Sequence, residues 1–168
     1  MDLRGKLVRL RRLTADDVDG VVAVMQDPTV ERWWGKYDQG KVVAEMIEDD
    51  EAFYFAVEWS GSLAGVIAYS EEDDPMYRHA AIDIALAERF QGRGIGPDAI
   101  RTLASHLFDG RGHHRLTIDP AEANVNAIKA YERVGFQRVG VMRQYERGLD
   151  GTFHNGMLMD MLAGELRE

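Results

Sequence analysis

The sequence predicts a single α/β domain, in which a mixed, mostly antiparallel sheet of about seven strands carries helices on both faces. Segments with apolar residues at alternate positions, typical of half-buried strands, recur along the chain. Other segments, with apolar residues at helical spacing, separate them in several places. The 168 residues suffice for one compact domain, 1–168, and no linker or low-complexity tract divides them.

Seven segments have the composition of strands. They are 6–13, 53–57, 63–69, 78–86, 115–118, 136–145 and 153–161. The second of these is rich in aromatic residues and ends before Ser60-Gly61, so it should form a hairpin with the third. The stretch 71–75 is expected to be an acidic loop. Asp150-Gly151 is expected to form the turn between the last two strands.

Five helices are expected between these strands. They lie at 14–25, after Asp27-Pro28, at 41–50, at 95–107 and at 124–134. Thr14 is a favourable N-cap for the first helix, and Pro28 suits the first turn of the second. Gly135 follows the last helix at the C′ position, where glycine is favoured.

The composition limits the function classes. The chain has no cysteine, which excludes disulfides, thiolate zinc sites and acyl-cysteine intermediates, and no histidine spacing suggests a metal. The formal charge of −9 argues against a nucleic-acid partner. It suits a cationic small substrate, although it can equally reflect solubility alone. No apolar run approaches the roughly 20 residues that span a bilayer, and the first residues lack a signal-peptide core, so the cytoplasm is expected and a membrane partner is not.

A glycine-rich stretch, Gln91-Gly92-Arg93-Gly94-Ile95-Gly96, separates an expected strand from an expected helix. It lacks the Gly-Lys-Ser/Thr ending of a P-loop, and Pro97 stands where a dinucleotide-binding fingerprint needs its third glycine. Backbone N–H groups and the dipole at a helix N-terminus nevertheless favour an anion such as phosphate. The alternative is a turn that only caps the helix.

A second motif lies downstream, Asn124-x-x-Ala127-Ile128-x-x-Tyr131-x-x-x-Gly135-Phe136. Together and in this order, the two motifs resemble the acyl-CoA-binding motifs of the GNAT superfamily of N-acetyltransferases. The resemblance implies a sheet whose fourth and fifth strands splay apart, with acetyl-CoA as co-substrate in the gap.

The resemblance also implies roles for individual residues. The main-chain amides of the glycine-rich stretch would hold the pyrophosphate, and Leu86 and Asn124 would bind the pantetheine arm, with Ala127 as part of the same motif. Tyr131 would lie near the thioester sulfur, where a phenol can donate a proton to the leaving thiolate. The alternatives are that Asn124 is a helix N-cap and that Tyr131 packs on the sheet.

Three further features resemble the aminoglycoside 6′-N-acetyltransferases within that superfamily. They are Glu31-Arg32-Trp33-Trp34-Gly35, Ile82-Asp83 and Thr117-Ile118-Asp119-Pro120. The resemblance implies that Trp33 and Trp34 wall the acceptor site, that Asp83 lies at the reacting amine, and that Asp119 contacts other amino groups. Core tryptophans and a simple Asp-Pro turn are the alternatives. The apolar Ile84-Ala85 after Asp83 departs from the best-known branch of that group.

Two other functions remain open from the sequence. The acceptor can instead be a protein N-terminus or a metabolite amine, as in ribosomal-protein acetyltransferases. The chain can also be a degenerate domain that binds acyl-CoA and regulates a partner. A monomer and a homodimer through the last strands are both compatible with the sequence.

Overall fold

The computed structural model describes residues 1–168 and contains one open eight-stranded sheet. The strands are β1 (Asp2–Arg4), β2 (Arg9–Arg12), β3 (Ala52–Trp59), β4 (Ser62–Glu72), β5 (His79–Leu86), β6 (Arg115–Ile118), β7 (Gln137–Arg147) and β8 (Phe153–Leu162). Their spatial order is β1-β2-β3-β4-β5-β6-β8-β7, and every neighbouring pair is antiparallel except β5 and β6. The prediction of a mixed, mostly antiparallel sheet is confirmed.

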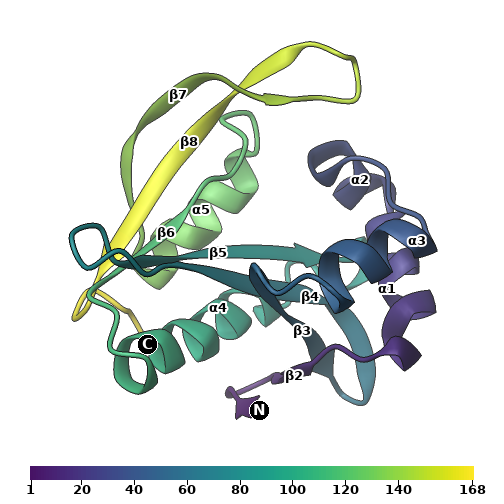
Figure 1. The fold of residues 1–168 in the computed structure, drawn as a ribbon, viewed down its shortest axis with the longest axis horizontal. Coiled ribbons are helices and arrows are strands. Elements are labelled where there is room, and N and C mark those ends of the chain that lie inside the picture. Colours follow the sequence, from purple (N-terminus) through teal and green to yellow (C-terminus); the bar gives the residue numbers. More distant parts are fainter.

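Five α-helices cover this sheet (Figure 1). They are α1 (Val18–Met25), α2 (Pro28–Trp34), α3 (Gln39–Val42), α4 (Ile95–Ser105) and α5 (Val125–Val134). α1 packs on β4 and β5, whereas α4 packs on β2 and β5 and also contacts α5. No helix is long and apolar enough to span a bilayer.

Helix α4 contributes several buried residues to the hydrophobic core. Its apolar residues recur at helical spacing, and Leu103 is fully buried in a cluster of 34 residues that also includes side chains from the strands. The helix begins after Gly94, whose φ of 81° lies in the left-handed region that favours glycine. The position of α4 therefore fixes the glycine-rich stretch at one end of the sheet.

The sheet opens between β5 and β6. These parallel strands pair only at Ala80–Leu116 and Ala81–Thr117, so the rest of β5, from Ile82 to Leu86, has no partner strand on this side. The expected fourth and fifth strands are β5 and β6, because β1 adds one strand before them. The predicted splay is thus confirmed.

The N-terminal segment differs from the prediction. The sequence predicted about seven strands, and β1 is the eighth; its three residues are too few to show an alternating pattern. The strand expected at 6–13 begins only at Arg9, because the preceding backbone turns around Asp98. The buried carboxylate of Asp98 accepts hydrogen bonds from the backbone N–H groups of Lys6, Leu7 and Val8, at 3.2, 2.7 and 3.0 Å.

Two further boundaries differ. The helix expected at 41–50 begins at Gln39, because Asp38 caps it, and continues as a π-helical turn only to Ile47. Strand β4 extends through the expected acidic loop to Glu72. Glu71 is paired there with Arg111 and with the buried His113, each at 2.6 Å, and the Arg111 hydrogen bond is the main cause of its lowered pKa. The predicted turn at Asp150-Gly151 lies between β7 and β8.

Candidate active site

The glycine-rich stretch forms the entry to α4. The backbone N–H groups of Gly92, Arg93 and Gly94 make no hydrogen bond within the protein. Those of Ile95 and Gly96 belong to the first turn of the helix, where backbone donors have no partner in the helix itself. Pro97 has no N–H to leave unpaired. Five of the six predicted amides are therefore available to an anion such as a pyrophosphate, whereas the Gln91 N–H donates to the Glu88 carbonyl at 3.0 Å.

Side chains connect this loop to helix α2. Gln91 donates from Nε2 to the Thr29 hydroxyl at 3.1 Å and to the Leu86 carbonyl at 2.9 Å. Asp27 caps α2 through Thr29 and also accepts a hydrogen bond from the Glu88 backbone N–H at 2.8 Å. Gln91 therefore connects the loop to α2 through its side chain, a contact that the sequence did not suggest. It also donates to the carbonyl of Leu86, the residue that the resemblance assigned to the pantetheine arm.

Helix α5 lies on the other side of the open edge of β5 (Figure 1). Asn124 is its N-cap, and the Asn124 side chain accepts a hydrogen bond from the Ala127 backbone N–H at 3.3 Å. The capping alternative for Asn124 is therefore correct, and its amide nitrogen makes no hydrogen bond in the protein.

Asp83 stands at the start of the unpaired part of β5. In the sheet register it is opposite Ala68, which is opposite Tyr54, so the three side chains share one face. Solvent reaches the Asp83 side chain, but surrounding protein removes much of its hydration. This desolvation is the main cause that raises the pKa of Asp83 to about 6, and the charges of Asp119 and Glu146 add to it.

Tyr131 lies near the same carboxylates. The ring of Tyr131, in helix α5, packs edge-on against the ring of Phe136, and the two ring centroids are 6.3 Å apart. Tyr131 also packs against the hydrophobic core. Burial raises the pKa of Tyr131, and the charges of Asp83 and Asp119 raise it further. The hydroxyl therefore stays protonated and makes no hydrogen bond within the protein, so it can donate to a ligand. Tyr131 therefore packs against the core and also has a hydroxyl that is free to bind a ligand.

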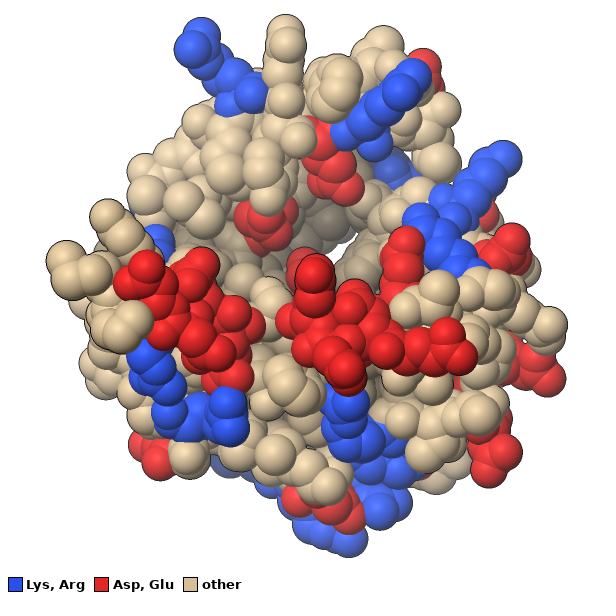
Figure 2. All heavy atoms as spheres, in the orientation of Figure 1, with Lys and Arg blue, Asp and Glu red and all other residues tan.

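Asp119 and Glu146 complete an acidic group with Asp83. Asp119 follows β6 and accepts a hydrogen bond from the Tyr145 hydroxyl, which raises the pKa of Tyr145 to about 12. Burial and then the charge of Asp119 raise the pKa of Glu146. None of the three carboxylates makes an ion pair with a lysine, arginine or histidine. Figure 2 shows acidic side chains gathered around a hollow between the β7–β8 hairpin and helices α2 and α3.

More tyrosines and carboxylates line the Asp83 face of the sheet. Tyr37 is buried and donates a hydrogen bond to Glu45 at 2.9 Å. Burial raises the pKa of Tyr54 to about 12, with smaller contributions from Asp83 and Glu45. None of these residues, nor Tyr145 and Glu146, was predicted as part of the site from the sequence. Only tertiary packing brings these residues together, and no local spacing indicates it.

The two tryptophans predicted to wall the acceptor site differ in their contacts. Trp34 packs against the hydrophobic core, as the structural alternative for such residues predicts. Trp33 is only partly buried, and the guanidinium of Arg32 lies 4.5 Å from its ring centroid. Trp33 and Trp34 are the last two residues of α2, the helix that is connected to the glycine loop through Asp27 and Thr29. Trp33 is therefore the better candidate for contact with a ligand.

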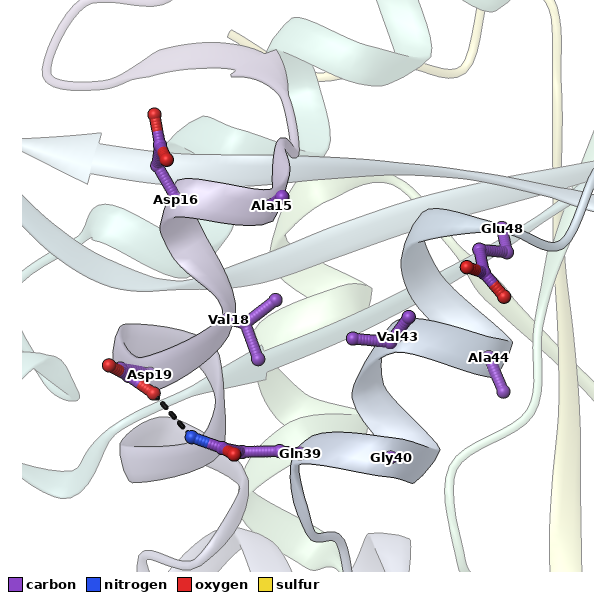
Figure 3. Close-up of a pocket in the computed structure, with 9 residues that line it drawn as sticks. All are labelled: Ala15, Asp16, Val18, Asp19, Gln39, Gly40, Val43, Ala44 and Glu48. Carbon is purple, nitrogen blue, oxygen red and sulfur yellow. Dashed lines mark hydrogen bonds between the residues drawn. The ribbon is translucent and has the colours of Figure 1, made fainter.

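A surface hollow lies elsewhere on the molecule. It has a volume of about 760 Å³ and lies between α1 and α3, where Gln39 donates a hydrogen bond to Asp19 at 2.6 Å (Figure 3). None of the predicted site residues lines it. No group of three or more His, Asp or Glu side chains has an arrangement that could hold a metal ion. The acidic group of Asp83, Asp119 and Glu146 therefore lies outside this hollow.

Known acetyltransferases resemble this chain over different shares of its length. Over 155 residues it is 26% identical to "Aminoglycoside N(6')-acetyltransferase type 1" of Klebsiella pneumoniae. This match covers 80% of this chain and 76% of that protein. Over 84 residues it is 31% identical to "Spermine/spermidine N(1)-acetyltransferase" of Bacillus subtilis, covering 47% of this chain and 55% of that protein.

Solved structures share the whole fold. A GNAT-family acetyltransferase from Bacillus anthracis superposes with a TM-score of 0.84 at 14% identity, covering 96% of this chain and 98% of the other. A ribosomal L7/L12 alpha-N-protein acetyltransferase in complex with coenzyme A superposes with a TM-score of 0.82 at 18% identity, covering 94% of each chain.

The family comparison agrees with the geometry of the glycine loop, the splayed strands and helix α5. The family described as "Acetyltransferase (GNAT) domain" matches residues 8–137, which is more than half of the chain. The predicted superfamily and fold are confirmed, and enzymes of this family transfer an acetyl group from acetyl-CoA. The chain therefore belongs to the GNAT family of acetyltransferases.

Proposed function

We propose that this acetyltransferase acts on a primary amine of a polycationic small molecule, with the 6′-amine of an aminoglycoside as the preferred acceptor. The observation that carries the proposal is the group of three carboxylates, Asp83, Asp119 and Glu146, none of which has a cationic partner in the protein. Unpaired carboxylates in a cleft attract and orient ammonium groups. The likeness to a 6′-N-acetyltransferase over 155 residues supports the same acceptor class.

Acetyl-CoA supplies the thioester, and the residues of this chain fit its parts. The free amides from Gly92 to Gly96 suit the pyrophosphate. The open edge of β5 and the free amide nitrogen of Asn124 suit the pantetheine arm. Because Leu86 is already bonded to the Gln91 side chain, binding through its carbonyl requires that side chain to move or to share the acceptor.

Asp83 and Tyr131 have opposite tasks in the proposed reaction. An acceptor amine is protonated at neutral pH and must lose a proton before it attacks. Asp83, with a pKa of about 6, is ionised at pH 7 and can take that proton directly or through water. As the C–N bond forms and the C–S bond breaks, the Tyr131 hydroxyl donates to the sulfur. No covalent enzyme intermediate is needed.

One assay tests the proposal. Purified protein and acetyl-CoA are mixed with aminoglycosides that carry a 6′-amine, their 6′-hydroxyl analogues, spermidine and a peptide with a free N-terminus, and free thiol is followed. Turnover with the 6′-amino drugs and not with the 6′-hydroxyl analogues is expected. Asp83→Asn should abolish most of this turnover. Asp73→Asn is the matched control, since it removes an exposed carboxylate that makes no hydrogen bond.

Other outcomes point to other acceptors. Preferred turnover of the peptide would support the N-terminal acetyltransferase, in line with the fold shared with the L7/L12 enzyme. Preferred turnover of spermidine would keep the polycationic class and exclude the drug as the main acceptor. No thiol release with any amine would contradict the proposal and favour a domain that binds acyl-CoA without transfer.

A further inference from the structure

Strand β7 is irregular where it passes the acidic group. Its register against β8 shifts between Met142 and Glu146, so residues of β7 bulge out of the ladder. Gln144 within the bulge has a φ of 48°, which is uncommon for any residue other than glycine. Its backbone N–H donates to Asn155 Oδ1 at 3.0 Å, and Asn155 Nδ2 donates to Glu122 at 2.9 Å. The bulge is therefore held in place by the neighbouring segments.

The bulge directs Tyr145 toward Asp119. The Tyr145 hydroxyl donates to Asp119 Oδ2, and its ring lies over Gly156 of β8. A Cβ atom at position 156 would lie 2.8 Å from Tyr145 Cδ1, closer than van der Waals contact permits. Gly156 also pairs with Ala121, close behind Asp119 in the chain. Bulges beside functional sites commonly redirect a side chain in this way.

Asp119 keeps one oxygen free. Oδ2 is occupied by the Tyr145 hydroxyl, whereas Oδ1 makes no hydrogen bond and no ion pair. We propose that Tyr145 is a positioning residue that holds the Asp119 carboxylate in one orientation, so that Oδ1 binds a second ammonium of the acceptor while the reacting amine lies at Asp83. This inference rests on the proposed acetyl transfer to a polyamine.

The arrangement makes the site selective for acceptors with more than one amine. A carboxylate whose orientation is already fixed loses little conformational freedom when it binds an ammonium. A monoamine gains nothing from Asp119, because its single nitrogen is at Asp83. Loss of the Tyr145 hydroxyl should therefore weaken binding of polyamines and leave monoamines unaffected.

Two measurements on the full chain test this role. Thiol release gives kcat and KM for kanamycin and for its monoamine counterpart, methyl 6-amino-6-deoxyglucoside. Calorimetry without acetyl-CoA gives Kd for kanamycin and spermidine. For Tyr145→Phe we expect KM and Kd for the polyamines to rise about 3- to 10-fold, from the loss of one hydrogen bond to a charged group. We expect kcat, and KM for the monoamine, to stay within twofold.

Further variants separate positioning from a merely structural role. Tyr77→Phe removes an exposed hydroxyl without a hydrogen bond and should change nothing. Gly156→Ala displaces the Tyr145 ring and should reproduce the polyamine effect. In an Asp119→Asn background, Tyr145→Phe should have no further effect, because Tyr145 acts through Asp119. Thermal melts check that each variant is folded.

The outcomes are distinct. Equal losses for polyamine and monoamine, an unchanged polyamine Kd in Tyr145→Phe, or additive losses with Asp119→Asn would overturn the inference. Absence of acetyl transfer to every amine would overturn the proposed reaction instead. The calorimetric comparison would still decide the role of Tyr145, since it needs no transfer.

Discussion

Replacing Asp83 with asparagine is expected to stabilise the folded chain above pH 7 while removing activity. The pKa of Asp83 rises from an ordinary value of 3.8 to about 6 in the folded protein, chiefly through desolvation. The folded state then binds the proton more tightly than the unfolded state. Stability therefore falls as the pH rises from about 4 to about 6 and stays lower above that range. Asparagine carries no charge and avoids this loss.

The magnitude follows from the two pKa values. A difference of about 2 in pKa corresponds to about 3 kcal/mol at full effect. Solvent reaches the Asp83 side chain, so screening reduces the effect, and about 1 kcal/mol is expected. For a domain of this size, that change raises Tm by about 2 to 4 °C.

Urea unfolding at pH 4 and pH 8 measures the effect. The free energy of unfolding of Asp83→Asn should exceed that of the unaltered protein by about 1 kcal/mol at pH 8 and match it at pH 4. Asp73→Asn should show no such difference between the two pH values. A loss of stability at pH 8, or a gain that is the same at both pH values, would refute the assigned cause of the shift.

Four other predictions follow from the same structure. Tyr131→Phe should lower kcat more than tenfold with little change in CoA affinity, and a large loss of CoA binding by calorimetry would contradict its assigned role. Asp83→Asn should lower turnover more than Asp119→Asn, and the reverse ranking would mean that the two carboxylates exchange roles. Gly94→Ala should weaken CoA binding because its φ of 81° is unfavourable for alanine, and unchanged affinity would count against the loop. Leu103→Ala should cost about 2 to 5 kcal/mol of unfolding free energy in urea, and a loss below about 1 kcal/mol would mean that α4 is less central to the core.

The local parts of the site could be predicted from the sequence. The glycine-rich stretch lies at the N-terminus of α4, and Asn124 and Gly135 cap the two ends of α5; at such termini the backbone geometry depends on a few neighbouring residues. Glycine at a left-handed position and asparagine at an N-cap are local requirements, so their positions in the chain reveal them. The alternation of apolar residues likewise predicted most of the sheet.

The non-local parts could not be predicted. Strand β1 is three residues long, and the turn of Lys6 to Val8 around Asp98 depends on a carboxylate about 90 residues away in the chain. The bulge at Gln144 arises from pairing with β8 and from the Asn155 side chain. Consequently the sequence suggested Asp119 as a ligand but gave no sign of Tyr145 beside it.

A crystal structure of the protein with bound coenzyme A tests the central claim most directly. The account predicts the pyrophosphate on the backbone amides from Gly92 to Gly96 and the pantetheine arm along the open edge of β5. It also predicts the sulfur within hydrogen-bonding distance of the Tyr131 hydroxyl and on the same side as Asp83. Coenzyme A bound elsewhere, with those amides facing solvent, would contradict it.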